Sequence, residues 1–156
     1  MQMAIIEFAR NKLNLKKATS SEFDKKGIHI IGLINEWKKG RKIIKGTDKD
    51  LGGTMRLGSY DAKLKENSMI KKIYKKNLIK ERHRHRYEVN IAYKEKFEKN
   101  GMDFSGLSPD GELPEIIELR NHPWFIGVQF HPEFKSRPLA PHPLFSSFIK
   151  AAKNHK

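Results

Sequence analysis

Gly127–Phe134, the stretch GVQFHPEF, joins the end of an apolar strand to a histidine, a proline and a glutamate. Because proline favours an extended backbone at the preceding residue, His131 and Glu133 are expected to project to the same side of the chain. The strand would place them at the carboxyl edge of a sheet, where α/β proteins gather their active sites. An adjacent carboxylate can hold one imidazole tautomer and stabilise the imidazolium. The pattern predicts a general base with its orienting acid; the alternative is a surface turn with a solvated glutamate.

A general base of this kind usually serves a cysteine or serine nucleophile. The 156 residues contain no cysteine, so they form no disulfide or thiolate metal site. They contain no G-x-S-x-G turn, and Ser59, Ser105 and Ser146 lie in contexts that indicate no activation. Gly52 and Gly53 lack the spacing and the Lys-Ser/Thr pair of a phosphate-binding loop. The sequence therefore leaves open which group the histidine serves.

Composition favours one globular domain, residues 1–156. Hydrophobic residues make up 37% of the chain, enough for a core, and no apolar run has the ~20 residues of a membrane helix. We expect a cytoplasmic protein with no membrane partner. The net charge of +14 is compatible with nucleic-acid binding. However, 24 of the 32 basic residues are lysines scattered along the chain, which argues against a dedicated docking surface.

Periodicity predicts a mixed α/β domain with most of its strands in the C-terminal half. An amphipathic helix is expected over Met3–Leu15, without a capping residue before it. The stretch Trp37–Leu51 is rich in basic residues and is expected to form an exposed loop or hairpin arm. Gly52-Gly53 is expected to form a turn. Further helices are predicted after Ser68, after Asn90 and from Pro143, and strands over residues 27–34, 81–89, 113–119 and 124–130.

The segment RHRHR, residues 82–86, admits several interpretations. On a strand, Arg82, Arg84 and Arg86 share one face, and His83 and His85 share the other. Two histidines are too few for a metal site, and no third ligand lies nearby in the sequence. The arginines could contact phosphate, or one could pair with a substrate carboxylate. A solvated basic edge strand explains the same pattern. Taken alone, the sequence favours that last interpretation.

Several motifs together resemble the C-terminal part of the glutaminase domain of CTP synthases. These are DLGGTMRLG, ERHRHRYEVN, the EIIEL and NHPWF segments, and GVQFHPEF with the residues that follow it. They occur in the family's order over nearly the whole chain. The resemblance implies a class I glutamine amidotransferase fold, an α/β flavodoxin-like three-layer sandwich. Its central sheet should be largely parallel, with the N-terminal strands lacking.

The resemblance also implies roles for individual residues. In the family, His131 matches the general base and Glu133 its partner in a Cys-His-Glu triad. Gln2, Glu22 and Arg86 match positions that hold the substrate glutamine. No metal ligand is implied, and no cofactor in this chain, because ATP and magnesium belong to the family's separate synthetase domain. That domain uses the released ammonia to aminate UTP to CTP, and the family forms homotetramers through it.

The family's nucleophile is a cysteine in the motif G-I-C-L-G-M-Q. Met1-Gln2 resembles the end of that motif, so the cysteine is expected three residues before Met1. By this interpretation the chain is a truncated product or half of a split enzyme, inactive unless an upstream fragment supplies the cysteine. Apolar residues of the first helix, including Ile5, Ile6 and Phe8, would then form an exposed patch. The alternative is a non-catalytic basic module that binds nucleic acid or another partner.

Overall fold

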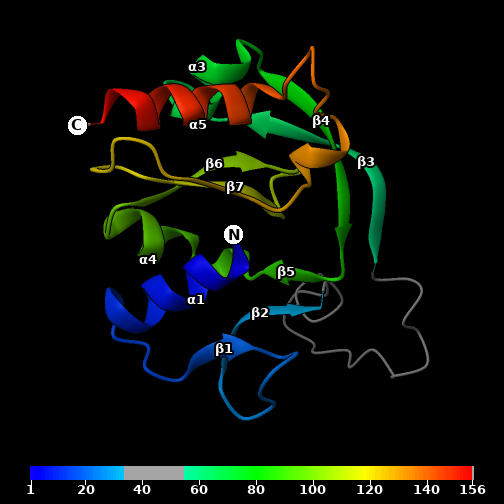
Figure 1. Ribbon diagram of the computed structural model, residues 1–156. Helices are drawn as coiled ribbons and strands as arrows, with labels where there is room; N and C mark the ends of the chain where they lie inside the picture. Colours follow the sequence, from blue (N-terminus) through cyan, green and yellow to red (C-terminus); the bar gives the residue numbers. More distant parts are fainter. Residues whose placement is uncertain (34–54, 156) are drawn as a thin grey trace.

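The structure, a computed structural model, describes residues 1–33 and 55–155. Two sheets lie on opposite sides of the first helix, α1, and two further helices cover the far face of the larger sheet (Figure 1). The expected basic arm over Trp37–Leu51 and the turn at Gly52-Gly53 lie outside the described residues. Among the described helices, none combines the length and apolar character needed to cross a membrane.

The larger sheet has five strands in the order β4-β3-β6-β7-β8. Every neighbouring pair in it is antiparallel. The links from β6 to β7 and from β7 to β8 are too short for the crossover that a parallel pair needs. In chain order the strands are β3 Arg56–Leu64, β4 Leu78–His85, β6 Met102–Leu107, β7 Pro114–Leu119 and β8 Ile126–Val128.

The smaller sheet has three strands in the order β1-β2-β5. They are β1 Ala18–Ser20, β2 Ile28–Leu33 and β5 Tyr87–Val89. Strands β1 and β2 are parallel, and β2 and β5 are antiparallel. The expectation of a largely parallel sheet was therefore wrong for the described residues, in which β1–β2 is the only parallel pair. Short links join β6 to β7 and β7 to β8, whereas parallel neighbours require long crossovers.

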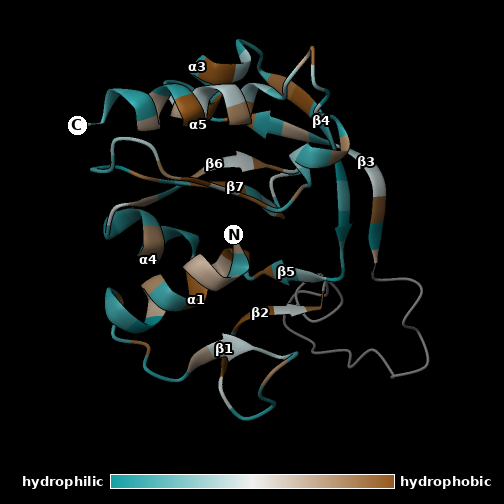
Figure 2. Ribbon diagram, viewed as in Figure 1, coloured by the Kyte–Doolittle hydropathy of each residue, from teal (hydrophilic) through white to brown (hydrophobic). Residues whose placement is uncertain are grey.

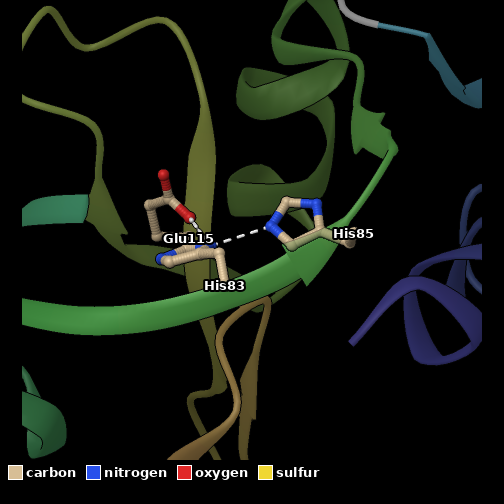
Figure 3. Close-up of side chains that lie close together, drawn as sticks. All are labelled: His83, His85 and Glu115. Carbon is tan, nitrogen blue, oxygen red and sulfur yellow. Dashed lines mark hydrogen bonds and ion pairs between the residues drawn. The ribbon is translucent and has the colours of Figure 1, made fainter. Parts of the chain in front are cut away.

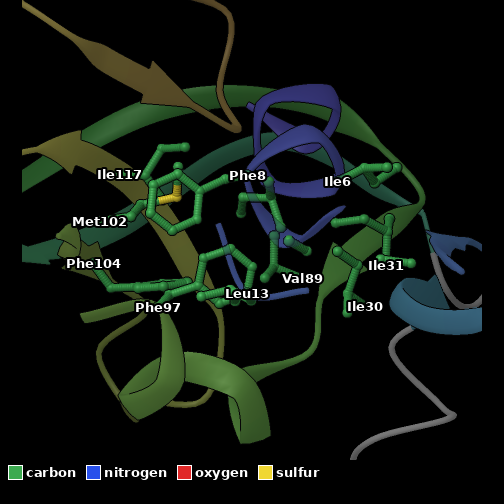
Figure 4. Packing of buried hydrophobic residues seen from close by; sticks show 13 residues of the cluster. Ile6, Phe8, Leu13, Ile30, Ile31, Val89, Phe97, Met102, Phe104 and Ile117 are labelled. Atoms are coloured by element: carbon green, nitrogen blue, oxygen red, sulfur yellow. The ribbon is translucent and has the colours of Figure 1, made fainter. Parts of the chain in front are cut away.

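Helix α1, Gln2–Asn11, packs between the two sheets (Figure 4). Its residues Ile5, Ile6 and Phe8 are buried, and Phe8 stacks on Phe97. The expected exposed apolar patch is therefore wrong for these three residues, because both sheets supply apolar partners. Met3 is 63% exposed, on the other side of the helix. As predicted from the sequence, no side chain caps the start of α1.

Strand β7 divides the core into two clusters, because successive side chains of a strand point to opposite faces. Ile117 packs in the cluster around α1, whereas Ile116 packs in a second cluster with Ile70 and Leu144. Figure 2 shows hydrophobic colours along β7 between the two helical layers. The far layer consists of α3, Met69–Tyr74, and α5, Pro143–Asn154.

Three predicted helix starts are confirmed. The Ser68 side chain accepts a hydrogen bond from the backbone of Lys71 at the start of α3. Asn90 caps the 3-10 helix η1, Ile91–Tyr93, which leads into α4, Lys94–Lys99. Pro143 occupies the first position of α5. Side-chain caps and an initial proline thus mark helix starts in this chain, as local chemistry requires.

The burial of α1 predicts that its two faces differ in their contribution to stability. Replacing Ile5, which is 0% exposed, with alanine should lower the free energy of unfolding by about 2–5 kcal/mol, because a cavity remains between the sheets. Met3→Ala on the exposed face is the matched control and should change it by about 0.5 kcal/mol or less. Urea unfolding of the 156-residue chain measures both. Equal effects, or unfolding without a cooperative transition, would contradict this packing.

Candidate active site

His131 and Glu133 lie together directly after β8, as the sequence predicts. The Nδ1 atom of His131 lies 2.7 Å from Oε1 of Glu133. The backbone N–H of His131 donates to the carbonyl of Arg82 on β4, over 2.8 Å, which fixes the loop to the neighbouring part of the sheet. The imidazole also stacks on Phe134, with ring centroids 5.2 Å apart. A backbone bond, a ring contact and a carboxylate thus define the orientation of the ring.

The chemistry of the pair assigns its protons. An ionised carboxylate can only accept, so Nδ1 of His131 carries the hydrogen and Nε2 is left as the basic atom. Burial alone would raise the pKa of Glu133, but the hydrogen bond from His131 outweighs it and lowers that pKa below its usual range. Glu133 therefore stays ionised at neutral pH. The His131 side chain is 37% exposed, so reacting groups can approach it.

The start of α1 lies against β8, close to this pair in the fold. A Cβ atom added to Gly127 would lie 3.4 Å from Cα of Met1 and collide with Ile117, so a glycine is needed there. Gln2, the next residue, donates from Nε2 to the carbonyl of Tyr87 at 2.7 Å and to Oε1 of Gln129 at 3.2 Å. Gln129 stands two residues before His131. The structure thus links Gln2 to the segment after β8 that contains the histidine.

The predicted faces of the RHRHR segment are confirmed for residues 82–85, whereas Arg86 lies outside the strand. His83 is buried and His85 largely so, whereas Arg82 and Arg84 are exposed. Arg86 lies in the bend between β4 and β5 and is half-buried. It directly precedes Tyr87, whose carbonyl accepts the hydrogen bond from Gln2.

Glu22 lies in the turn after β1 and is exposed. Its backbone N–H donates to the Ser20 hydroxyl at 3.2 Å. Within residues 1–33 and 55–155, no hydrogen bond or ion pair connects its carboxylate with the other predicted site residues. The structure therefore joins Gln2 to Gln129, two residues before His131, and to Tyr87, the residue after Arg86, but it does not connect Glu22 with them.

A buried polar cluster lies behind the exposed pair. His83 and His85 on β4 approach Glu115 on β7 (Figure 3). The carbonyl of Tyr87 can only accept, so the Nδ1 atom of His85, 3.2 Å away, donates to it. Nε2 of the neutral His85 must then accept from Nδ1 of His83, 2.8 Å away. Burial lowers the pKa of His83 to about 3 and that of His85 to about 4, so both rings are neutral.

Arg56, the first residue of β3, supplies the positive charge of this cluster. Its guanidinium donates to Glu115 through a short contact and lies 3.4 Å from Oε1 of Glu88 on β5. Both glutamates are fully buried. Burial raises the pKa of Glu88 to about 7 and also raises that of Glu115, because one guanidinium offsets only part of the cost of two buried carboxylates.

The side chains of His83, His85 and Glu115 carry atoms that can bind a metal ion. One such atom from each residue lies within 4.8 Å of the other two. Glu115 is the third ligand that sequence spacing did not reveal. Tetrahedral zinc holds nitrogen ligands about 3.3 Å apart, whereas the two rings lie at hydrogen-bonding distance, 2.8 Å. Arg56 already neutralises Glu115. The geometry therefore fits a hydrogen-bonded, ion-paired network better than a metal centre.

Comparison with known proteins shows the family of the chain. The glutamine amidotransferase class-I family matches residues 1–151. The chain belongs to this family. Among curated relatives, this amidotransferase chain is 87% identical to the CTP synthase of Pelagibacter ubique over 156 residues, all of the chain and 29% of that protein. It is 60% identical to the CTP synthase of Hyphomonas neptunium over 97% of the chain and 28% of that protein.

A solved structure gives the same assignment for the fold. The amidotransferase chain matches a Trypanosoma brucei CTPS glutaminase domain with bound acivicin at a TM-score of 0.84 and 36% identity, over 100% of the chain and 58% of that structure's chain. The predicted class I glutamine amidotransferase fold and the resemblance to the CTP synthase glutaminase domain are therefore confirmed. The chain spans less than a third of the length of the curated relatives.

Sequence patterns did not indicate a role for four residues of this region: Arg56, Glu88, Glu115 and Gln129. One signal could have indicated two of them. Glu115 and Glu88 stand in apolar strands, PEIIEL and YEV, where a charged residue requires a buried partner. The identity of that partner depends on how β3, β5 and β7 meet, which local patterns do not contain.

The raised pKa of Glu88 predicts a pH dependence of stability. Between about pH 4.5 and about pH 7 the folded chain keeps a proton on Glu88 that the unfolded chain has released. This residue therefore stabilises the fold more as the pH falls through that window. Relative to Glu88→Gln, the wild type should lose up to about 1.4 kcal/mol of unfolding free energy per unit of rising pH. Urea unfolding at several pH values measures it, and parallel profiles would refute it.

Proposed function

We propose that residues 1–156 are the C-terminal portion of a glutaminase domain that releases ammonia from glutamine. The observation that carries the proposal is the His131–Glu133 pair, 2.7 Å apart and open to solvent. The start of α1 packs against the strand that precedes this pair. A base with an orienting carboxylate suits acyl transfer, in which a proton must leave a nucleophile and reach the leaving amine.

In this mechanism a thiolate attacks the side-chain amide carbon of glutamine. His131 takes the thiol proton through Nε2 and passes it to the nitrogen as the carbon–nitrogen bond breaks, so ammonia leaves and a thioester remains. His131 then removes a proton from water, which attacks the thioester and releases glutamate. Since the 156 residues contain no cysteine, the thiol comes from a segment outside them. Glu133 stabilises the imidazolium that forms in each step.

Three residues are proposed to hold the glutamine. The Arg86 guanidinium can pair with the α-carboxylate through two parallel hydrogen bonds. The carboxylate of Glu22 can accept from the α-ammonium group, and Gln2 can contribute its amide oxygen. The location of Gln2 and Arg86 around the Tyr87 carbonyl supports a shared role for these two residues.

The whole enzyme is proposed to be a CTP synthase. Its synthetase part, outside this chain, would bind ATP and magnesium and use the ammonia to convert UTP to CTP. The identity to CTP synthases over 97% or more of the chain supports this assignment. Assembly as a homotetramer, and joining to a part that carries the nucleophile, belong to the same proposal.

The test uses a chimera in which these 156 residues replace the corresponding 29% of Pelagibacter ubique CTP synthase. The chimera should release ammonia from glutamine, and His131→Ala should lower kcat to background because the thiol is no longer deprotonated. Glu133→Gln should lower kcat less, because the imidazole itself remains. A coupled glutamate assay measures all three proteins.

The 156-residue chain alone is the control and should release no ammonia above background. Glutaminase activity from that chain, or a chimera indifferent to His131→Ala, would refute the mechanism. An inactive chimera, together with salt-dependent RNA binding by the 156-residue chain, would favour a nucleic-acid-binding role instead.

Arg86 gives a separate prediction for substrate binding. In the chimera, Arg86→Lys should raise the KM for glutamine by about 10- to 100-fold, because a lysine cannot form the two parallel bonds of a guanidinium. Arg84→Lys is the matched control, since Arg84 is exposed on the same segment, and its KM should stay within about twofold. Equal KM values for the Arg86 and Arg84 variants would remove Arg86 from the glutamine site.

A further inference from the structure

The amide group of Gln2 has a fixed orientation. Its Nε2 atom donates to the Tyr87 carbonyl at 2.7 Å and to Oε1 of Gln129 at 3.2 Å. Both partners are oxygen atoms without a hydrogen, so they cannot bond to the amide oxygen of Gln2. The two hydrogens of Nε2 are therefore committed, and Oε1 of Gln2 points away from both partners as an acceptor.

Gln129 is oriented in turn by Glu88. Nε2 of Gln129 donates to Oε2 of Glu88 at 2.9 Å. Gln129 is 6% exposed and Glu88 is 0% exposed, so water has little access to their contact. An ionised carboxylate accepts only, which forces the amide nitrogen of Gln129 toward Glu88 and its oxygen toward Gln2.

The chain of hydrogen bonds from Gln2 through Gln129, here called the relay, ends at Glu88, which lies beside Arg56 and can only accept where it is ionised. Arg56 lies 3.4 Å from Oε1 of Glu88, and Glu115 holds the same guanidinium from the other side. An arginine side chain donates only and keeps its charge. Donors thus approach Glu88 from both Arg56 and Gln129, and the direction of each hydrogen bond between Glu88 and Gln2 follows from this arrangement.

We propose that Glu88, acting through Gln129 and together with the Tyr87 carbonyl, is a positioning residue that sets the amide orientation of Gln2 and presents its oxygen to a donor group of the ligand. This inference rests on the proposed function, in which the ligand is glutamine and the donor its α-ammonium group. If the amide of Gln2 were reversed, its N–H groups would face the ammonium group. Glu88 itself touches no substrate and acts across two side chains.

The experiment measures glutamine hydrolysis by the chimera at pH 8, where Glu88 is ionised. Glu88→Gln should raise the KM for glutamine about tenfold and change kcat at saturation by less than about threefold, because an amide at 88 can donate as well as accept. The exchange variant Glu88→Gln/Gln129→Glu should restore the KM to within about threefold of wild type. In it, the carboxylate at 129 accepts from Gln2 on one oxygen and from the new amide on the other.

Glu118→Gln is the matched control, because Glu118 is also a buried glutamate but accepts from Met69 and Ile70 at the start of α3. It should lower stability and leave the KM for glutamine unchanged. Should Glu88→Gln fail to fold, Gln129→Met tests the same relay, because it removes the acceptor for Gln2 and keeps the Arg56–Glu88 pair. It should raise the KM about tenfold.

Two results overturn the relay: a KM unchanged by Glu88→Gln or by Gln129→Met in an active chimera, or an exchange variant no better than Glu88→Gln. A merely structural role for Glu88 would lower stability without a selective change in KM, and the exchange would not rescue it. Failure of the wild-type chimera to hydrolyse glutamine is a different outcome, which overturns the proposed function itself.

Discussion

The architecture of this chain depends on the buried ion pairs that the Arg56 guanidinium forms with Glu88 and Glu115. Arg56 begins β3 in the larger sheet, contacts Glu115 on β7 of the same sheet, and reaches Glu88 on β5 of the smaller sheet. The same side chain lies over the ring of Tyr60, 4.4 Å from its centroid. Removing one partner of a buried ion pair typically costs about 3–5 kcal/mol, because the other charge is left uncompensated. Arg56 thus fixes the position of one sheet relative to the other, because its hydrogen bonds are directional and an apolar contact is not.

The junction between the sheets explains where the candidate site lies. Strand β4 belongs to the larger sheet and β5 to the smaller one, and Arg86 alone separates them. The chain therefore turns from one sheet into the other at the bend that carries Arg86. The first turn of α1 fits against this corner through Gln2, and the loop after β8 brings His131 against the backbone of Arg82. Polar groups of α1, β4, β5 and the loop after β8 therefore meet where the chain passes from one sheet to the other.

The sequence predicted features that depend on neighbouring residues. The His131–Glu133 contact, the opposite faces of RHRHR and the caps at Ser68 and Asn90 are of this kind. It did not predict the burial of α1 between two sheets, because burial depends on distant strands. The same reason explains why Arg56 was not identified as the partner of two glutamates, 32 and 59 residues away. Family resemblance added roles for Gln2, Glu22 and Arg86, which remain predictions.

The exposed His131–Glu133 pair and the buried cluster of His83, His85 and Glu115 combine the same residue types, and their surroundings give the two groups different properties. Around His83 and His85, burial lowers the histidine pKa values, so both rings are neutral, and burial also raises the pKa of Glu115. At the exposed pair the hydrogen bond from His131 lowers the pKa of Glu133, so charge is favoured. A general base must gain and lose a proton during each turnover, which costs little only where charge is tolerated. The buried group therefore suits a rigid scaffold, whereas the exposed pair has the surroundings that the proposed general base requires.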